Sequence, residues 1–145
     1  MTIDRSGTWW KGSQAADLDE YLIGLSAGEH PVTHLVHAHC EQCGGDTFRI
    51  WVDDPEACAR RSCVHCGEAE YMLDSDEVAR DATLTPVVCP CGGTTYQVAA
   101  GFATRESGDP HWVYIGLRCA TDGTLGAPAD WCIERAPADR LFSTV

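Results

Sequence analysis

Basic residues are scarce in this chain. Its 145 residues include 10 lysines and arginines against 22 aspartates and glutamates, a formal net charge of −12, and the single lysine is Lys11. A protein this acidic repels phosphate backbones, so the composition disfavours nucleic acid as a partner. Long apolar stretches are missing as well: no run reaches about 18 residues, and we expect no membrane partner. The first residues lack the basic and apolar parts of a secretory signal, which favours a cytoplasmic protein.

Cysteine, in contrast, is abundant. The chain has nine cysteines, and an odd number without a secretory signal argues against a disulfide framework. Reduced cysteines in close pairs favour metal binding instead. The apolar fraction of 44% is sufficient for a globular core and excludes full disorder.

The cysteines belong to a pattern that occurs twice. Residues 43–48 and 91–96 share Cys-Gly-Gly-x-Thr-aromatic, and a hairpin-like stretch and a second cysteine element follow each copy. We expect the hairpins to turn near 53–55 and 107–110, where Asp, Pro or Gly occur. Closing strands are expected over 70–73 and 130–134. This internal repeat predicts two similar β units.

The first unit carries two Cys-x-x-Cys pairs, which are Cys40, Cys43, Cys63 and Cys66. Each pair forms a tight turn that lets two sulfur atoms approach one ion to about 2.3 Å. Gly67 follows the second pair and can adopt the positive φ that such a turn often needs. We therefore predict that these four cysteines bind one metal ion.

The second unit departs from this pattern. Its three cysteines are Cys89, Cys91 and Cys119, and Asp122 stands where the fourth is expected. The fourth ligand is Asp122, Cys132 on the expected closing strand, His111, or water. A water ligand would give the open position that catalytic zinc needs, whereas a decayed unit would bind no metal. We predict a second ion here and leave its fourth ligand open.

On these residues the chain resembles the zinc-ribbon (rubredoxin-like knuckle) superfamily, over about residues 40–135. The resemblance implies two tandem ribbons, the second degenerate, with Zn²⁺ as the cofactor of each. Iron is the rival metal for four cysteines, and ligand softness and the tandem arrangement favour zinc. Zinc ribbons occur in nucleic-acid-binding proteins, enzyme lids, assembly factors and adaptors, so the resemblance selects no single function.

The predicted fold is small and mostly β, stabilised by metal, with an N-terminal amphipathic helix and two tandem zinc-ribbon hairpin units. The helix is expected over 14–25, with Ser13 as its N-cap and an apolar stripe that includes Leu18, Leu22 and Leu25. A strand is expected over 32–39 and a short helix within 74–84. The implied divisions are 1–39 (helix and lead-in strand), 40–75 (first ribbon), 76–88 (linker), 89–135 (second ribbon) and 136–145 (tail).

Several other residues are interpreted as structural. We expect solvent-facing side chains at His34, His37, His39 and His65 rather than metal ligands. Cys58 is a spare thiol without an identifiable base. The only local basic cluster, Arg49 with Arg60 and Arg61, is small for a nucleic-acid surface.

These features favour a zinc-binding, non-catalytic adaptor or regulatory module that interacts with another protein. The acidic surface would select a basic partner, and self-association stays open. One alternative is a small zinc enzyme with an open second site. A further alternative is a nucleic-acid-binding regulator.

Overall fold

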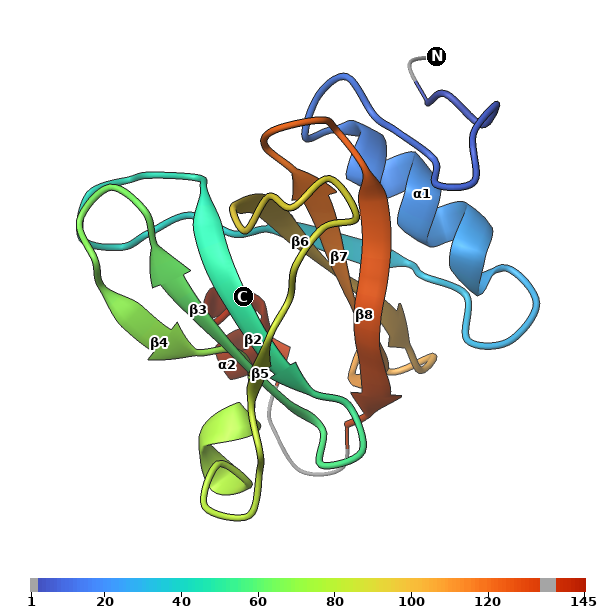
Figure 1. Cartoon of the computed structure of the whole chain (residues 1–145). Coiled ribbons are helices and arrows are strands. Elements are labelled where there is room, and N and C mark those ends of the chain that lie inside the picture. The colour runs from blue at the N-terminus through green and yellow to red at the C-terminus, as the bar shows by residue number, and fades with distance from the viewer. Residues whose placement is uncertain (1–2, 134–137) are drawn as a thin grey trace.

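The computed structural model describes residues 3–133 and 138–145. Its elements, in chain order, are α1 (Asp17–Ser26), β1 (His34–His37), β2 (Phe48–Asp53), β3 (Cys58–Cys63), β4 (Ala69–Tyr71), the 3₁₀ helix η1 (Ser75–Glu77), β5 (Thr85–Pro86), β6 (Tyr96–Thr104), β7 (Pro110–Cys119), β8 (Leu125–Cys132) and α2 (Ala138–Ser143). The protein is mostly β with an N-terminal helix, as the sequence predicts (Figure 1).

The eight strands form one antiparallel sheet. Its order is β4-β3-β2-β6-β7-β8, with β1 paired to β6 and β5 paired to β2. The two repeated hairpins, β2–β3 and β6–β7, are joined through a single register pair between Phe48 and Tyr96. In Figure 1 strands β2–β4 lie on the left and strands β6–β8 on the right, and the main core contains residues of both halves. The repeat therefore builds two parts of one sheet around a shared core.

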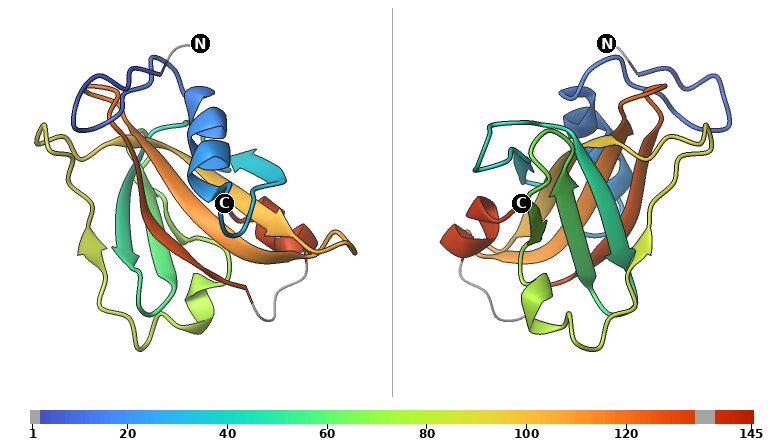
Figure 2. Two further views of the ribbon diagram at one scale, coloured as in Figure 1. Left: turned by 90° about the vertical axis from the view of Figure 1, so that its right-hand side faces the viewer. Right: turned by 60° about the vertical axis from the view of Figure 1, so that its left-hand side comes forward.

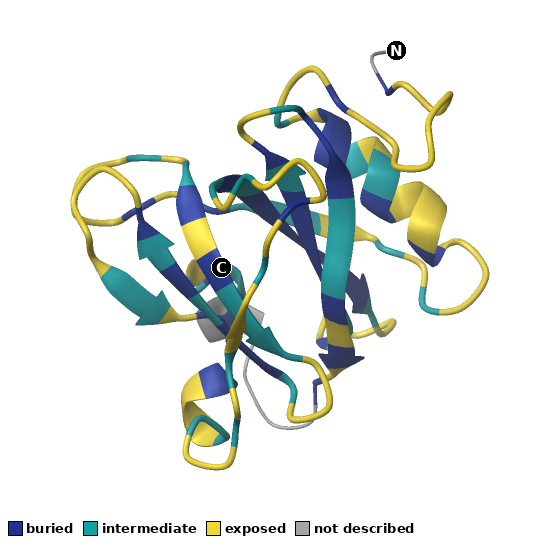
Figure 3. Ribbon diagram, in the orientation of Figure 1, coloured by how far each residue is buried: buried dark blue, intermediate teal, exposed yellow. Residues whose placement is uncertain are grey.

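Strands β6 and β7 are buried on both faces. Val98, Ala100 and Phe102 of β6 belong to the main core together with Val113, Ile115 and Leu117 of β7. The alternate residues Ala99 and Tyr114 belong to a second core beneath α1. Because successive side chains of a strand point to opposite faces, this division accounts for the nearly continuous burial of both strands (Figure 3).

Helix α1 packs closely on β6 and β7 because both strands carry a glycine beneath it. A Cβ atom added at Gly116 would lie 2.9 Å from Leu22 Cδ1. One added at Gly101 would lie 3.4 Å from the same Leu22 atom and 2.9 Å from Cγ2 of Val32, which follows the helix. Leu18 and Leu22 are fully buried against these strands. The views in Figure 2 show α1 lying along this face of the sheet.

Helix α1 differs from the sequence prediction at both ends. Ser13 does not cap it, because the Asp17 carboxylate accepts hydrogen bonds from the N–H groups of Ser13 at 2.8 Å and Gln14 at 3.2 Å. Residues 13–14 form a bend and 15–16 a turn, and the helix begins at Asp17. Leu25, expected in the buried stripe, is 51% exposed.

The remaining elements are placed close to the predicted positions. Strand β8 begins at Leu125, earlier than the expected closing strand, because it pairs along β7; Glu134 lies outside the described residues. The expected connecting helix is reduced to η1. Within the described part of the chain, no helix is long and apolar enough to cross a membrane.

Candidate metal centres

Four thiols gather at one end of the β2–β3 hairpin. Cys40, Cys43, Cys63 and Cys66 each offer a sulfur atom, and these atoms all lie within 4.8 Å of one another. The Sγ atoms of Cys40 and Cys66 are 3.5 Å apart, as are those of Cys43 and Cys63. A tetrahedral ion with bonds of about 2.3 Å to sulfur holds its ligands roughly 3.8 Å apart. The donor set thus fits one tetrahedral ion.

The backbone around these thiols forms two tight turns. The N–H of Gly44 donates to Cys40 O at 2.8 Å, and the N–H of Gly67 donates to Cys63 O at 2.9 Å. Gly44 and Gly67 have φ of 75° and 80°, a region that favours glycine. Between the turns, a Cβ at Gly45 would come within 3.3 Å of the Cys43 and Cys63 sulfur atoms. The second glycine of the repeat therefore keeps the space beside the sulfur cluster clear.

The electrostatics of this cluster favour a bound cation. The backbone N–H groups of Cys66 and His65 point at the Cys63 sulfur and lower the pKa of that thiol to about 6. At Cys66 the N–H of Glu68 favours the thiolate, but the Cys40 sulfur and burial prevail and raise the pKa to about 12. Four crowded thiols cannot all ionise beside one another at neutral pH, and a divalent ion removes this conflict because it neutralises the thiolates.

A second cluster occupies the same position on the β6–β7 hairpin. Cys89, Cys91, Cys119 and Asp122 bring three sulfur atoms and a carboxylate oxygen within 4.8 Å of one another. Cys91 Sγ lies 3.7 Å from Cys119 Sγ, and Cys89 Sγ lies 3.6 Å from Asp122 Oδ1. Three thiolates and one carboxylate are an acceptable donor set for tetrahedral zinc.

The two clusters share their backbone frame. The N–H of Gly123 donates to Cys119 O at 2.9 Å, which repeats the second turn of the first cluster. The N–H of Gly92 donates to Cys89 O at 2.8 Å, in a turn one residue shorter than its counterpart. Gly92 and Gly123 again have positive φ, 89° and 81°. A Cβ at Gly93 would come within 3.2 Å of the Cys91 and Cys119 sulfur atoms. We call residues 40–45 with 63–67 the first knuckle, and residues 89–93 with 119–124 the second knuckle.

Asp122 is held as an ionised side chain. Its Oδ1 accepts a hydrogen bond from the Thr124 N–H at 3.0 Å, and its Oδ2 lies 3.7 Å from Lys11 Nζ. The Thr124 N–H and Lys11 lower the pKa of this carboxyl well below its usual value. Burial, in contrast, raises the pKa of the neighbouring Cys89 thiol to about 11. At neutral pH the Asp122 carboxylate is thus ready to bind a cation, whereas the Cys89 thiol must first lose its proton.

Cys132 and His111, the other fourth-ligand candidates, lie elsewhere. Cys132 is the register partner of Trp112, near the start of β7, whereas Cys119 is the last residue of that strand. The seven residue steps of extended strand from Trp112 to Cys119 span about 23 Å, so Cys132 lies at the far end of β7 from the second cluster. His111 precedes Trp112 and stacks edge-on against His30. The structure thus brings Asp122, and neither of these two, to the second cluster.

The other singled-out residues have structural contacts. His37 Nε2 lies 2.7 Å from Asp19 Oδ1, His34 packs on Phe142, and His39 and His65 are exposed. Cys58 is buried, and burial raises its pKa. Arg61 is also buried: its Nε donates to Val145 O at 3.1 Å, so its charge is turned inward.

No family model, no curated protein and no solved structure matches this chain. The chemistry of the two clusters therefore follows from their own donor atoms.

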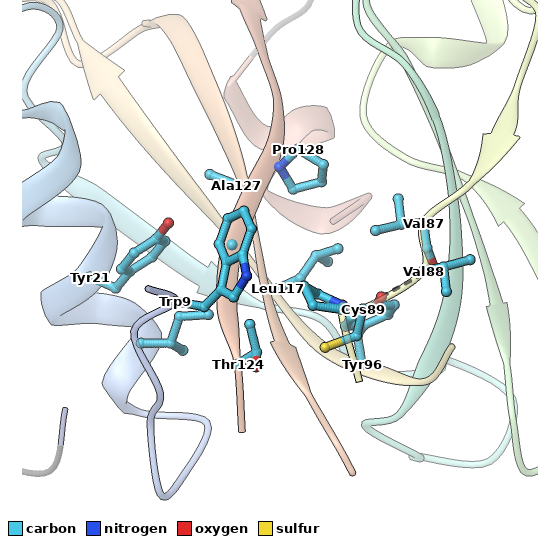
Figure 4. A pocket seen from close by; sticks show the side chains of 13 residues that line it. Trp9, Tyr21, Val87, Val88, Cys89, Tyr96, Leu117, Thr124, Ala127 and Pro128 are labelled. Carbon is cyan, nitrogen blue, oxygen red and sulfur yellow. Dashed lines mark hydrogen bonds between the residues drawn. The ribbon is translucent and has the colours of Figure 1, made fainter. Parts of the chain in front are cut away.

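A hollow that the cysteine pattern does not predict adjoins the second knuckle. It has a volume of about 450 Å³ and is bounded by Cys89 and Pro90 on one side, β8 at its base and Trp9 on the other (Figure 4). Among the described residues that line this hollow, the titratable ones are Cys89, Tyr21 and Tyr96. The sequence signals that could have found it are the apolar pairs Trp9-Trp10 and Val87-Val88, which lie outside the periodic elements.

Proposed function

We propose that this protein is a zinc-binding, tandem zinc-ribbon protein that acts without catalysis, as an adaptor or regulatory module for another protein. The observation that carries the proposal is the complete donor set of both clusters: four thiols in the first, and three thiols with the Asp122 carboxylate in the second. A structural zinc site has four protein ligands, whereas a catalytic one keeps a position for water or substrate.

Zinc is the ion that suits both clusters. Four thiolates also suit iron, but the second set mixes thiolate with carboxylate, and zinc accepts sulfur, nitrogen and oxygen donors alike. Each ion would connect the ends of its hairpin, Cys40 and Cys43 to Cys63 and Cys66 in the first knuckle. The sheet has a shared core of its own, so the ions would stabilise the knuckles rather than replace that core.

The surroundings of the second cluster support a non-catalytic role. The hollow beside Cys89 is mainly apolar, and its described lining has no histidine, glutamate or lysine that could act as a general base. The inward-facing Arg61 argues against a nucleic-acid regulator, since it removes one charge from the cluster of Arg49, Arg60 and Arg61.

The test is metal content combined with cobalt substitution. Native mass spectrometry of the protein as purified should give two zinc ions per chain, and Cys63→Ser should lose the first of them. Cys58→Ala is the matched control, because Cys58 is as buried as Cys63 but lies outside both clusters.

Cobalt(II) in place of zinc reports on the coordination. The visible bands should be those of tetrahedral thiolate sites and should stay unchanged on addition of azide or cyanide. Bands that shift with these anions would reveal an exchangeable position and favour the enzyme alternative. Purification with iron, or without metal, would contradict the zinc assignment.

A further inference from the structure

The exposed apolar side chains of this protein gather in one place. Seven large apolar side chains of the described residues are exposed, and four of them, Trp9, Trp10, Leu25 and Val88, line two hollows that share Trp9, Tyr21 and Leu125. The second hollow has a volume of about 360 Å³. Trp9 is 55% exposed and lies between them, with Tyr21 on one side and the second knuckle on the other (Figure 4). We call the two hollows together the Trp9 groove.

The shape of the groove fits a chain better than an enclosed small molecule. Both hollows are open to solvent and follow one another along the surface, so each can take a bulky side chain from a ligand that continues past Trp9. Exposed aromatic side chains in adjoining hollows are the usual anchors of protein interfaces.

Strand addition is blocked at this groove. Strand β8 is the edge strand that lines it, and an unprotected edge offers its N–H groups to a further strand. Here the Leu125 N–H donates to Trp10 O at 2.8 Å, and the Asp130 N–H donates to Asp54 Oδ1 at 3.0 Å. Pro128 between them has no N–H. These contacts favour recognition of a ligand through its side chains.

Charge selects the ligand. Arg5, the base that lines the groove, lies over Trp10 and 3.8 Å from Glu20, and Lys11 of the same N-terminal segment lies 3.7 Å from Asp122, so both are already paired. The rest of the chain supplies the excess of acidic residues, with a net charge of −12. A basic ligand is attracted to this surface and an acidic one is repelled.

We propose that the Trp9 groove binds a basic peptide segment of another protein, which inserts bulky apolar side chains on either side of Trp9. The proposal deepens the adaptor function and rests on it. Both walls of the groove are attached to the second knuckle: Cys89 and Pro90 belong to it, and the segment that carries Trp9 is joined to it by the Gly12 N–H, which donates to Gly123 O at 2.8 Å.

The experiment is selection from a display library of random peptides on the zinc-loaded chain, with Trp9→Ala as the counter-selected variant. Enriched sequences should combine a tryptophan, phenylalanine or leucine with nearby lysine or arginine. A synthetic peptide of the enriched sequence should bind about tenfold or more weakly to Trp9→Ala, and more weakly as salt rises. Tyr71→Ala removes an aromatic side chain of comparable exposure outside the groove, and it should bind as the wild type does.

Three outcomes would overturn the proposal: no enrichment over an unrelated acidic protein, enrichment of acidic peptides, or equal binding to wild type and Trp9→Ala. If the peptide selection fails but the chain binds two zinc ions and its cobalt bands are insensitive to anions, the zinc-ribbon assignment stands. Only the proposal that the groove binds a peptide is then refuted. Cleavage of the bound peptide, seen by mass spectrometry, would instead contradict the non-catalytic function.

Discussion

Lys11 Nζ lies 3.7 Å from Asp122 Oδ2, so the segment that carries Trp9 and Trp10 is joined to the second knuckle by charge as well as by backbone. Arg118, the β7 residue directly before the knuckle, also holds this segment, because its Nε donates to Gly12 O at 2.8 Å. The order of this segment should therefore depend on the second metal site.

Hydrogen exchange measures that dependence. In Cys91→Ser, the loss of the second ion should loosen the turn at Asp122 and Gly123, and the Gly12 amide should exchange at least about tenfold faster than in the wild type. The Thr33 amide, which donates to Phe102 O at 2.8 Å away from the knuckle, is the internal control. Equal acceleration of both amides would mean global unfolding and would contradict a local link.

Substitutions that remove the Asp122 carboxylate, or replace it with a thiol, test whether Asp122 is the fourth ligand. Asp122→Ala should release the second ion, whereas Asp122→Cys should bind it more tightly, because it restores the four-thiolate set of the first knuckle. Competition with a chromophoric chelator gives the affinities. Cys132→Ser is the matched control and should keep both ions; zinc loss in that variant, with Asp122→Ala unaffected, would refute the assignment.

Gly116 should be intolerant of a side chain. Gly116→Ala places a methyl group 2.9 Å from Leu22 Cδ1, and overpacking of this kind costs about 1–3 kcal/mol of the free energy of unfolding. Gly126→Ala, on the neighbouring strand, meets nothing within 4 Å and should cost far less in urea denaturation.

A double variant separates steric clash from strand propensity. If the clash is with Leu22, Gly116→Ala should cost less in a Leu22→Ala background than in the wild type. Additive costs would show that α1 does not press on Gly116.

Tyr96 should make the protein less stable in alkali. Burial and the nearby Cys89 and Cys119 sulfur atoms raise its pKa from 10.0 to about 12. A raised pKa in the folded state means that the unfolded state loses its proton first. The contribution to stability is therefore complete below pH 10 and is lost as pH rises toward 12.

The measurement is thermal denaturation at a series of alkaline pH values. Tyr96→Phe keeps the ring but cannot ionise, so its melting temperature should fall less steeply above pH 10 than that of the wild type. Parallel slopes would show that Tyr96 titrates normally.

The sequence was most informative where the chemistry is local. The spacing of Cys40, Cys43, Cys63 and Cys66 predicted a cluster of four thiols, since two short turns and one hairpin determine that geometry. Val98, Ala100 and Phe102 of β6 alternate along the sequence, as do Val113, Ile115 and Leu117 of β7, and this local pattern marks the two strand faces that line the main core.

Long-range contacts could not be predicted in this way. The pairing of Phe48 with Tyr96 joins residues 48 positions apart, and no local pattern indicates that two hairpins share a sheet. Asp122 and Cys132 were equal candidates because a choice between them requires the register of β8 on β7. Ser13 was the expected cap because its residue type favours that role, but the Asp17 carboxylate accepts hydrogen bonds from the Ser13 and Gln14 N–H groups, and the helix begins only at Asp17.

The Phe48–Tyr96 pair also bears on how such a chain could have arisen. The two residues are equivalent members of the repeat, each five positions after its Cys-Gly-Gly cysteine, and they face one another in antiparallel register. Antiparallel pairing of equivalent residues creates a local two-fold axis, which is the geometry of a symmetric homodimer. Duplication and fusion of a hairpin that once paired with its own copy would leave this arrangement. After fusion the two halves could diverge separately, one keeping four cysteines while the other exchanged a thiolate for Asp122.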